Sequence, residues 1–456
     1  MIPVPEKLTG SRMKLFFVSL GCDKNLVDSE KMLSLLSGEG YSITDDEKAA
    51  DVIIINTCCF IDDAAQESID TILEMASYKK EGNLKALIVT GCLAQRYQKQ
   101  ILEEIPEADA VVGVSSADRI VQAIKEALAD QKVQFIEDES RTPVLSASRM
   151  VTTGGHYAFL KIAEGCDKHC TYCIIPSLRG SYRSVPMEDL VKEARILVDG
   201  GVKELILVAQ ETTLYGTDLY GEKRLHLLVR ELSKIPDLKW IRLMYCYPEE
   251  IYDELIDEIA ANPKVCHYLD IPIQHCNDEI LKRMGRKTNS EEIIALVTKL
   301  RDKVPDICLR TSLITGFPGE SDEQHEELMD FINEMEFDRL GVFAYSQEEG
   351  TPAARMEGQI PEDVKEKRRD DLMALQQEIS ADLNTEKIGR ELTVMVEGRN
   401  VDEDVYVCRT YADAPDVDSY LFLKTPWELM SGDFINVTVT EAGEYDLIGI
   451  PAPDEE

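Results

Sequence analysis

The sequence predicts an α/β protein with an N-terminal parallel α/β domain (residues 12–130), a central partial (β/α)6 TIM-like barrel (residues 152–385) and a small C-terminal antiparallel β-barrel (residues 386–454). The first two parts are each predicted by one series in which apolar, strand-like runs alternate with helical stretches. Such alternation indicates parallel sheets with helices on their faces. The third observation is a change to short patterned strands separated by Asp, Gly and Pro, which indicates a barrel.

The first alternating series covers residues 14 to about 128. Its strand candidates are the runs KLFFVSLGC, DVIIINTC, LKALIVTGC and ADAVVGV. Stretches with helical spacing follow them, for example Asp62–Ser77 and Ala94–Glu104. From about Gln131 to Thr153 the chain is polar and irregular, so we expect a linker there.

The second series covers residues 157 to about 346. Its strand candidates are YAFLKIAEGC, KELILVAQ, LKWIRLMY, HYLDIPIQ, ICLRTSLITGFP and RLGVFAYS, with helices between them such as Met187–Val198 and Asp322–Met335. Six consecutive βα units predict an open barrel whose active site lies at the carboxyl ends of the strands. A charged helix at Glu362–Asn384 connects this barrel to the short strands that begin near Glu386.

Composition limits the classes of function. No apolar run approaches the roughly 18–20 residues that span a bilayer, and residues 1–12 lack the apolar core of a signal peptide, so we expect a cytoplasmic protein. The formal net charge of −37 makes nucleic acid an improbable main partner. Solubility and a basic protein partner explain this charge equally well.

Twelve cysteines in a chain expected to be cytoplasmic are core residues, metal ligands or nucleophiles rather than disulfides. The segment EGCDKHCTYC places Cys166, Cys170 and Cys173 directly after the first strand of the central barrel. A structural zinc site normally has four protein ligands, and the nearest fourth candidate, His169, is awkwardly adjacent to Cys170. Three cysteines on a four-iron cluster instead leave one iron open for a ligand.

Cys22, Cys58 and Cys92 form a second, scattered triplet. Each stands at the end of an apolar strand, in SLGC, NTC and TGC, and the carboxyl ends of parallel strands lie side by side. The three thiols could therefore meet at one point, and the glycines before Cys22 and Cys92 would let the backbone approach a bulky cluster closely. Cys59 could replace Cys58, but only one of the two can point at the site, because neighbouring side chains of a strand point to opposite faces.

The spacing C-x3-C-x-aromatic-C in the central segment resembles the signature of radical S-adenosylmethionine (SAM) enzymes. The resemblance implies a 4Fe-4S cluster whose open iron binds SAM and whose electron splits it into a 5′-deoxyadenosyl radical. It also implies that Tyr172 lies near the adenine. Gln210, at the start of the segment Gln210–Thr213, and Gly316, in GFPGE, could line the cofactor pocket, but simple strand-to-helix turns explain both segments equally well.

Nearly the whole chain resembles the methylthiotransferases. The matching segments are GCDKNLVDSE, NTCCFIDDAAQES, TGCLAQRY and CIIPSLRGSYRS. The resemblance implies a second 4Fe-4S cluster on Cys22, Cys58 and Cys92, and it selects Cys58 over Cys59. It further implies a C-terminal TRAM domain for substrate recognition and an electron donor such as flavodoxin or ferredoxin. A non-catalytic electron carrier is the alternative, but two separate triplets with open positions disfavour it.

Two branches of the family modify a tRNA adenosine or an aspartate of small-subunit ribosomal protein twelve. Gly21–Glu30 resembles the protein-modifying branch, G-C-P-K-N-x-V-D-S-E, except for Asp23 in place of proline. Residues 386–456 contain 17 acidic and 5 basic residues, a balance of −12. A barrel that contacts tRNA should be basic, whereas an acidic one attracts an Arg/Lys-rich ribosomal protein. We therefore expect the protein substrate.

The other cysteines share no spacing and are expected to be small core residues: Cys246, Cys266, Cys276, Cys308 and Cys408. His275 follows an apolar strand and is expected to be a structural histidine rather than a pocket residue.

Overall fold

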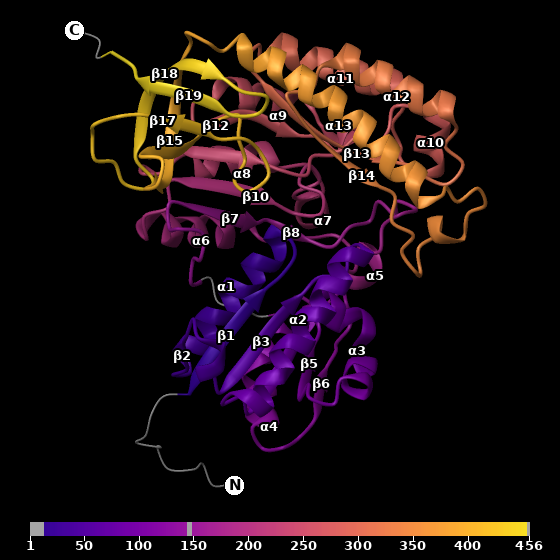
Figure 1. Cartoon of the computed structure of the whole chain (residues 1–456), viewed down its shortest axis with the longest axis vertical. Helices are drawn as coiled ribbons and strands as arrows, with labels where there is room; N and C mark the ends of the chain where they lie inside the picture. The colour runs from indigo at the N-terminus through magenta and orange to yellow at the C-terminus, as the bar shows by residue number, and fades with distance from the viewer. Residues whose placement is uncertain (1–12, 144–147, 454–456) are drawn as a thin grey trace. The chain divides into compact units, whose positions relative to one another are not determined.

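The computed structural model describes residues 13–143 and 148–453. It divides the chain into two compact units (Figure 1). The first unit contains the residues up to Met150 together with Ser177–Gly180, and the second contains Val151–Pro176 and the residues from Ser181 onward. Helix by helix, this described part of the chain offers no segment both long enough and apolar enough to cross a membrane.

The first unit contains a six-stranded parallel sheet in the order β2-β1-β3-β4-β5-β6. The four strands predicted from the apolar runs are confirmed as β1 (Lys14–Ser19), β3 (Val52–Thr57), β4 (Ala86–Gly91) and β5 (Ala110–Val112). Sequence reasoning missed the edge strands β2 (Ser42–Ile43) and β6 (Val133–Phe135). Strand β6 lies within the stretch expected to be irregular, and it forms because its backbone pairs with β5.

Helices connect these strands: α1 (Asp23–Gly38), α2 (Asp62–Glu81), α3 (Cys92–Glu104) and α4 (Ile120–Ala127), with short 3-10 turns at Glu47–Ala49 and Val114–Arg119. Every residue of the central strands β3 and β4 is buried. This agrees with their continuous apolar sequence, which is typical of parallel strands covered on both faces.

The second unit confirms the partial TIM-like barrel. Its parallel strands follow chain order: β7 (Tyr157–Lys161), β10 (Glu204–Val208), β11 (Trp240–Leu243), β12 (Val265–Asp270), β13 (Cys308–Thr315) and β14 (Arg339–Ala344). A small antiparallel pair, β8 (Ala163–Glu164) and β9 (Arg183–Ser184), follows β7.

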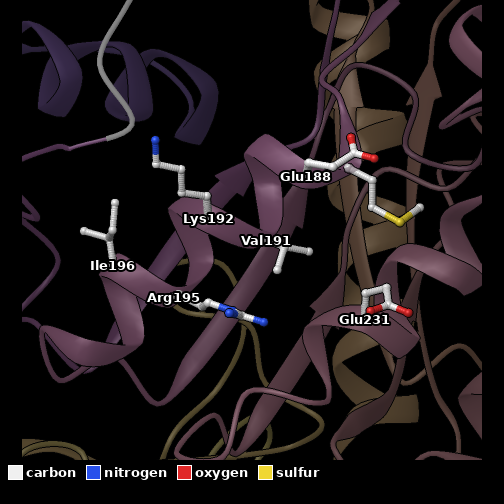
Figure 2. Close-up of a pocket in the computed structure, with 7 residues that line it drawn as sticks. Glu188, Val191, Lys192, Arg195, Ile196 and Glu231 are labelled. Carbon is white, nitrogen blue, oxygen red and sulfur yellow. The ribbon is translucent and has the colours of Figure 1, made fainter.

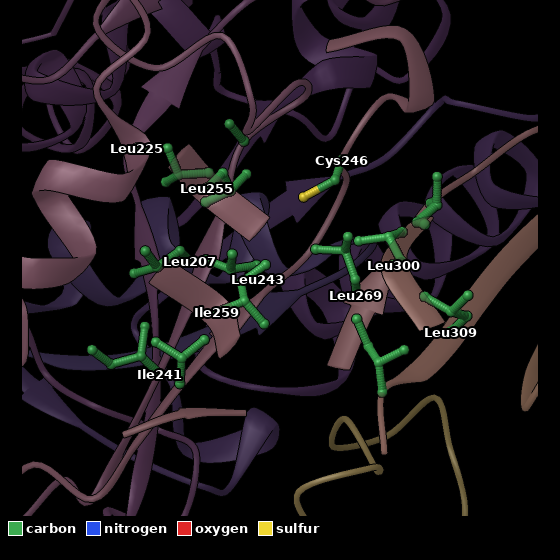
Figure 3. Packing of buried hydrophobic residues seen from close by; sticks show 14 of the residues in the cluster. Leu207, Leu225, Ile241, Leu243, Cys246, Leu255, Ile259, Leu269, Leu300 and Leu309 are labelled. Atoms are coloured by element: carbon green, nitrogen blue, oxygen red, sulfur yellow. The ribbon is translucent and has the colours of Figure 1, made fainter. Parts of the chain in front are cut away.

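The helices of the central region are α5 (Ile175–Arg179), α6 (Met187–Asp199), α7 (Thr217–Tyr220), α8 (Leu225–Leu232), α9 (Asp253–Ala261), α10 (Asp278–Arg283), α11 (Ser290–Lys303), α12 (Asp322–Met335) and α13 (Glu362–Thr385), with 3-10 turns at Pro248–Glu250 and Ala353–Arg355. Leucines from neighbouring strands, such as Leu207 and Leu243, pack with helix residues such as Leu225 and Leu255 (Figure 3). The five predicted core cysteines are buried.

The C-terminal region forms a closed five-stranded barrel in the order β15-β16-β17-β19-β18. Its strands are β15 (Glu391–Asn400), β16 (Val405–Thr410), β17 (Leu421–Leu423), β18 (Phe434–Ala442) and β19 (Leu447–Pro451). The barrel is confirmed, but the expectation that it is wholly antiparallel is wrong, because β17 and β19 pair in parallel. The chain must cross from β17 through β18 before β19 closes the barrel, which leaves these two strands running in the same direction.

The barrel packs on the central sheet through buried charges. Glu204, Arg242 and Arg409 are fully buried, and each guanidinium group donates to one oxygen of the Glu204 carboxylate at 2.7 Å. Burial alone would raise the pKa of Glu204, but the two arginines lower it below the usual value. Met395 of the barrel and Trp240 of the sheet share an apolar cluster beside this triad.

Arg409→Ala is expected to lower the free energy of unfolding by about 3–5 kcal/mol, because it leaves buried Glu204 with one partner fewer. Arg399→Ala is the control, since Arg399 forms an exposed ion pair with Asp404 in the same barrel and should cost less than about 1 kcal/mol. Chemical denaturation of both variants measures the difference. Equal losses would show that the buried triad adds no stability.

Candidate metal centres

The scattered cysteines meet at one edge of the first sheet. Cys22 follows β1 and is the N-cap of α1, Cys58 follows β3, and Cys92 is the first residue of α3 after β4. Because β1, β3 and β4 are neighbours, their carboxyl ends bring the three thiols to the same edge.

The thiols are close enough to influence one another electrostatically. Burial raises the pKa of Cys92 to about 11, with further contributions from Cys22 and Cys58. Burial also raises the pKa of Cys58, and the charge of Cys22 adds to this. Buried thiols of this kind become thiolates when a metal binds them. The donor set therefore fits an iron–sulfur cluster.

The side chain of Cys58 lies beside Gly21, the residue before Cys22. A Cβ placed on Gly21 would lie 2.9 Å from the Cys58 Sγ atom. Cys59 is fully buried, and its backbone carbonyl accepts a hydrogen bond from Arg96 at 3.4 Å. The contact with Gly21 favours Cys58 as the middle ligand, but burial and the charge of nearby Cys92 also raise the pKa of Cys59, so the choice remains a prediction.

Two polar residues at this site were not predicted from the sequence. Asn25 donates to the carbonyl oxygens of Leu20 and Thr57, both at 3.1 Å, and so joins the ends of β1 and β3. Buried Arg179 donates to the side-chain Oδ1 atom of Asn25, and its Nη2 atom lies 3.5 Å from the Cys92 Sγ atom. Asn25 and Arg179 stand inside the segments that carry the family resemblance, but only the fold shows that they meet.

The glycines before the cysteines allow the chain itself to pack closely. Gly91 has φ of +93°, and a Cβ there would lie 2.5 Å from the carbonyl oxygen of Thr57. Close packing between strand ends therefore explains Gly91, and the approach of the backbone to a cluster remains a prediction.

Gly91→Ala is expected to lower the free energy of unfolding by about 2–5 kcal/mol, because it adds backbone strain and a clash with β3. Gly40→Ala provides a matched control, since Gly40 has φ of +92° in the same unit but nothing within 4 Å of an added Cβ. Backbone strain alone should cost that variant about 1–2 kcal/mol. If the denaturation curves of the two variants coincide, the clash with β3 contributes nothing to the loss of stability in Gly91→Ala.

The central triplet lies in the loop after β7 and β8. Cys166 and Cys170 are buried and Cys173 is half-buried. Burial, followed by the charge of Cys170, raises the pKa of Cys166 to about 11, and burial raises that of Cys173 to about 12, with Cys170 and Cys166 contributing. Within the described residues, no three His, Cys, Asp or Glu side chains are close enough to hold a single ion. In a four-iron cluster each thiolate binds a separate iron.

His169 is exposed, with a left-handed backbone (φ 52°), whereas Cys170 beside it is buried. The loop thus directs these neighbours to different environments. Tyr172 is half-buried, and its ring packs in a cluster with Phe317 and Tyr345. Burial, followed by the charge of Cys170, raises the pKa of Tyr172.

The other predicted pocket residues lie at the ends of the barrel strands. The Gln210 side chain donates to Glu164 at 2.9 Å. Glu211 is fully buried, and burial raises its pKa to about 7. A Cβ on Gly316 would lie 2.4 Å from Cγ of Lys365, so packing against α13 also explains this glycine. Contacts of Gln210 and Gly316 with a cofactor remain predictions.

The structural role expected for His275 remains a prediction. The side chain is fully buried, and its Nδ1 atom accepts the backbone N–H of Asn277 at 2.9 Å, whereas its Nε2 atom has no hydrogen-bond partner among the described residues. Burial lowers its pKa to about 3, which keeps the ring neutral. A separate surface groove runs along α6 and α8 (Figure 2) and contains no cysteine among its lining residues: Met187, Glu188, Val191, Lys192, Arg195, Ile196 and Glu231.

Three protein-family models match separate segments of the chain. Residues 14–113 match the Uncharacterized protein family UPF0004, residues 160–332 the Radical SAM superfamily, and residues 388–451 the TRAM domain. Among solved structures, the radical S-adenosylmethionine methyltransferase TsrM from Kitasatospora setae shares the fold, with a TM-score of 0.53, 16% identity and 73% of each chain covered. The fold and the central triplet define a radical SAM enzyme.

Curated relatives define the family more closely. A protein from Lachnoclostridium phytofermentans named ribosomal protein uS12 methylthiotransferase RimO is 60% identical over 96% of this chain and 99% of its own length. A protein of the same name from Clostridium perfringens is 52% identical over 96% of this chain and 98% of its own length. The chain belongs to the ribosomal protein uS12 methylthiotransferase family.

Proposed function

We propose that the protein transfers a methylthio group to the β-carbon of an aspartate in ribosomal protein uS12. Removal of hydrogen from an unactivated carbon lies beyond any side-chain base tuned near neutral pH, so a radical is required. The observation that carries the proposal is the presence of two cysteine triplets, one at the carboxyl ends of the parallel strands β1, β3 and β4 and one in the loop that follows β7 and β8. The similarity to uS12 methylthiotransferases over 96% of the chain supports it.

Each triplet has a separate task in this proposal. Cys166, Cys170 and Cys173 bind a 4Fe-4S cluster with an open iron, while Cys22, Cys58 and Cys92 bind the cluster that delivers sulfur. When bound, the two clusters and SAM supply the electron, the radical and the methylthio group. Tyr172, Gln210 and Gly316 contact SAM. A flavodoxin or ferredoxin supplies the electrons, and the reaction takes place in the cytoplasm.

The proposed domains are residues 12–130 for the second cluster, 152–385 for radical formation and 386–454 for substrate recognition. Residues 386–456 contain 17 acidic and 5 basic residues, a balance of −12, which suits a basic ribosomal protein. The same charge repels the phosphates of tRNA.

Turnover of the reconstituted enzyme with SAM and a reductant tests the proposal. Purified uS12 and tRNA are offered separately, and mass spectrometry measures methylthio addition to each. We expect the adduct on an aspartate of uS12. An adduct on tRNA adenosine alone would reassign the substrate, and absence of 5′-deoxyadenosine would contradict the enzymatic role.

A further inference from the structure

Arg286 is a buried cation with unused donor groups. Its side chain is 0% exposed, and one N–H of Nη2 is donated to the carbonyl oxygen of Pro272 at 3.0 Å. The Nε and Nη1 atoms have no hydrogen-bond acceptor within residues 13–143 and 148–453. A buried donor without an acceptor lowers the stability of the folded state by about 1–3 kcal/mol, and by more when the group is charged. We therefore expect an acceptor outside the polypeptide.

The backbone before Arg286 is fastened to the central cysteine loop. The N–H of Thr171 donates to the carbonyl oxygen of Met284 at 2.9 Å. The Thr171 hydroxyl group donates to the carbonyl oxygen of Arg283 at 2.8 Å. Because Thr171 directly follows Cys170, these bonds hold Arg286 at a defined place relative to the loop.

Tyr247 connects Arg286 to the thiol of Cys170. The guanidinium carbon of Arg286 lies 4.2 Å from the centre of the Tyr247 ring. The hydroxyl oxygen of the same tyrosine lies 3.7 Å from the Cys170 Sγ atom. The nearest carboxylate oxygen to Arg286, on Glu249, is 3.7 Å from Nη2, which leaves Nε and Nη1 unbonded.

We propose that Arg286 and Tyr247 are positioning residues that donate hydrogen bonds to sulfur on the Cys170 side of the central cluster and raise its reduction potential. The inference rests on the proposed function, because it requires a cluster on Cys166, Cys170 and Cys173. Hydrogen bonds to cluster sulfur and nearby positive charge favour the reduced, more negative form. The unbonded nitrogen atoms of Arg286 thereby gain acceptors in the loaded enzyme.

A redox titration of the loaded, full-length chain tests this. Cys22, Cys58 and Cys92 are replaced by alanine so that the central cluster alone contributes, and its electron paramagnetic resonance signal is followed without SAM. Arg286→Met should shift the one-electron reduction equilibrium about tenfold toward the oxidised form, which is 59 mV. Tyr247→Phe should give a smaller shift in the same direction, and Arg286→Lys should restore part of the wild-type value.

Arg301→Met controls for loss of a positive charge, because Arg301 donates to the carbonyl oxygens of Met335 and Glu336 at the end of α12. It should leave the potential unchanged. An unchanged potential in Arg286→Met, together with weaker SAM binding, would assign the donors to the SAM carboxylate and overturn the inference. Absence of iron in the parent chain would instead refute the proposed function.

Thermal unfolding without iron provides a second measurement. In the apo protein Arg286→Met should unfold at the wild-type temperature or higher, because the substitution removes unsatisfied buried donors. After cluster reconstitution the same variant should gain less stability than the wild type. A variant destabilised equally in both states would give Arg286 a structural role only and contradict the inference.

Discussion

Cys166→Ala is expected to reduce 5′-deoxyadenosine formation to the level without enzyme. Two remaining cysteines cannot hold a four-iron cluster with one open iron for SAM. The iron content should fall by about four atoms per chain, since a cubane cluster has four irons. Chromatographic quantification of 5′-deoxyadenosine and a colorimetric iron assay on reconstituted protein measure both effects.

Cys266→Ala is the matched control, because Cys266 is a buried core residue on β12 outside both triplets. Its iron content and its 5′-deoxyadenosine formation should equal those of the wild type. Wild-type 5′-deoxyadenosine formation by Cys166→Ala would refute the assignment of the central cluster.

Cys58→Ala is expected to separate the two half-reactions. Methylthio addition to uS12 should fall at least about 100-fold. Loss of a residue that only supports a metal ligand already costs up to about 100-fold, and Cys58 is proposed as a ligand itself. Formation of 5′-deoxyadenosine should persist, because the central triplet is intact. Mass spectrometry of uS12 and quantification of 5′-deoxyadenosine in the same reaction give the ratio directly.

Cys59→Ala distinguishes the neighbouring thiol. Because Cys58 rather than Cys59 has its Sγ atom beside Gly21, the Cys59 variant should retain four irons at this site and methylthio addition. The opposite pattern, with Cys59→Ala inactive and Cys58→Ala active, would exchange the two residues as ligands.

The sequence predicts those parts of the fold that depend on local pattern. The continuous apolar runs identify β3 and β4, and six further runs identify the strands of the partial barrel in their observed order. Cysteines at the strand ends also indicate where Cys22, Cys58 and Cys92 meet. The edge strands β2 and β6 were not predicted, because strands of two and three residues show too little alternation of apolar and polar residues. They form through pairing with β1 and β5.

Features that depend on distant contacts are not visible in the sequence. Arg179 stands 87 residues from Cys92, and no local pattern relates the two. The sequence around Arg286 likewise gives no sign of a special role, and only the fold shows that its guanidinium group lies over the Tyr247 ring. The parallel pairing of β17 and β19 depends on how the barrel closes, which the strand runs alone do not encode.

The buried triad of Glu204, Arg242 and Arg409 has a consequence for how substrates are chosen. If the barrel moved away from the sheet, the buried Glu204 carboxylate would lose its ion pair with Arg409. This energetic cost holds the barrel in a fixed position on the sheet. If the barrel binds the substrate protein, as proposed, the target residue of that protein lies at a constant distance from β10 and β11. The choice of substrate then depends on the distance, within the substrate protein, between the surface that the barrel binds and the residue that is modified.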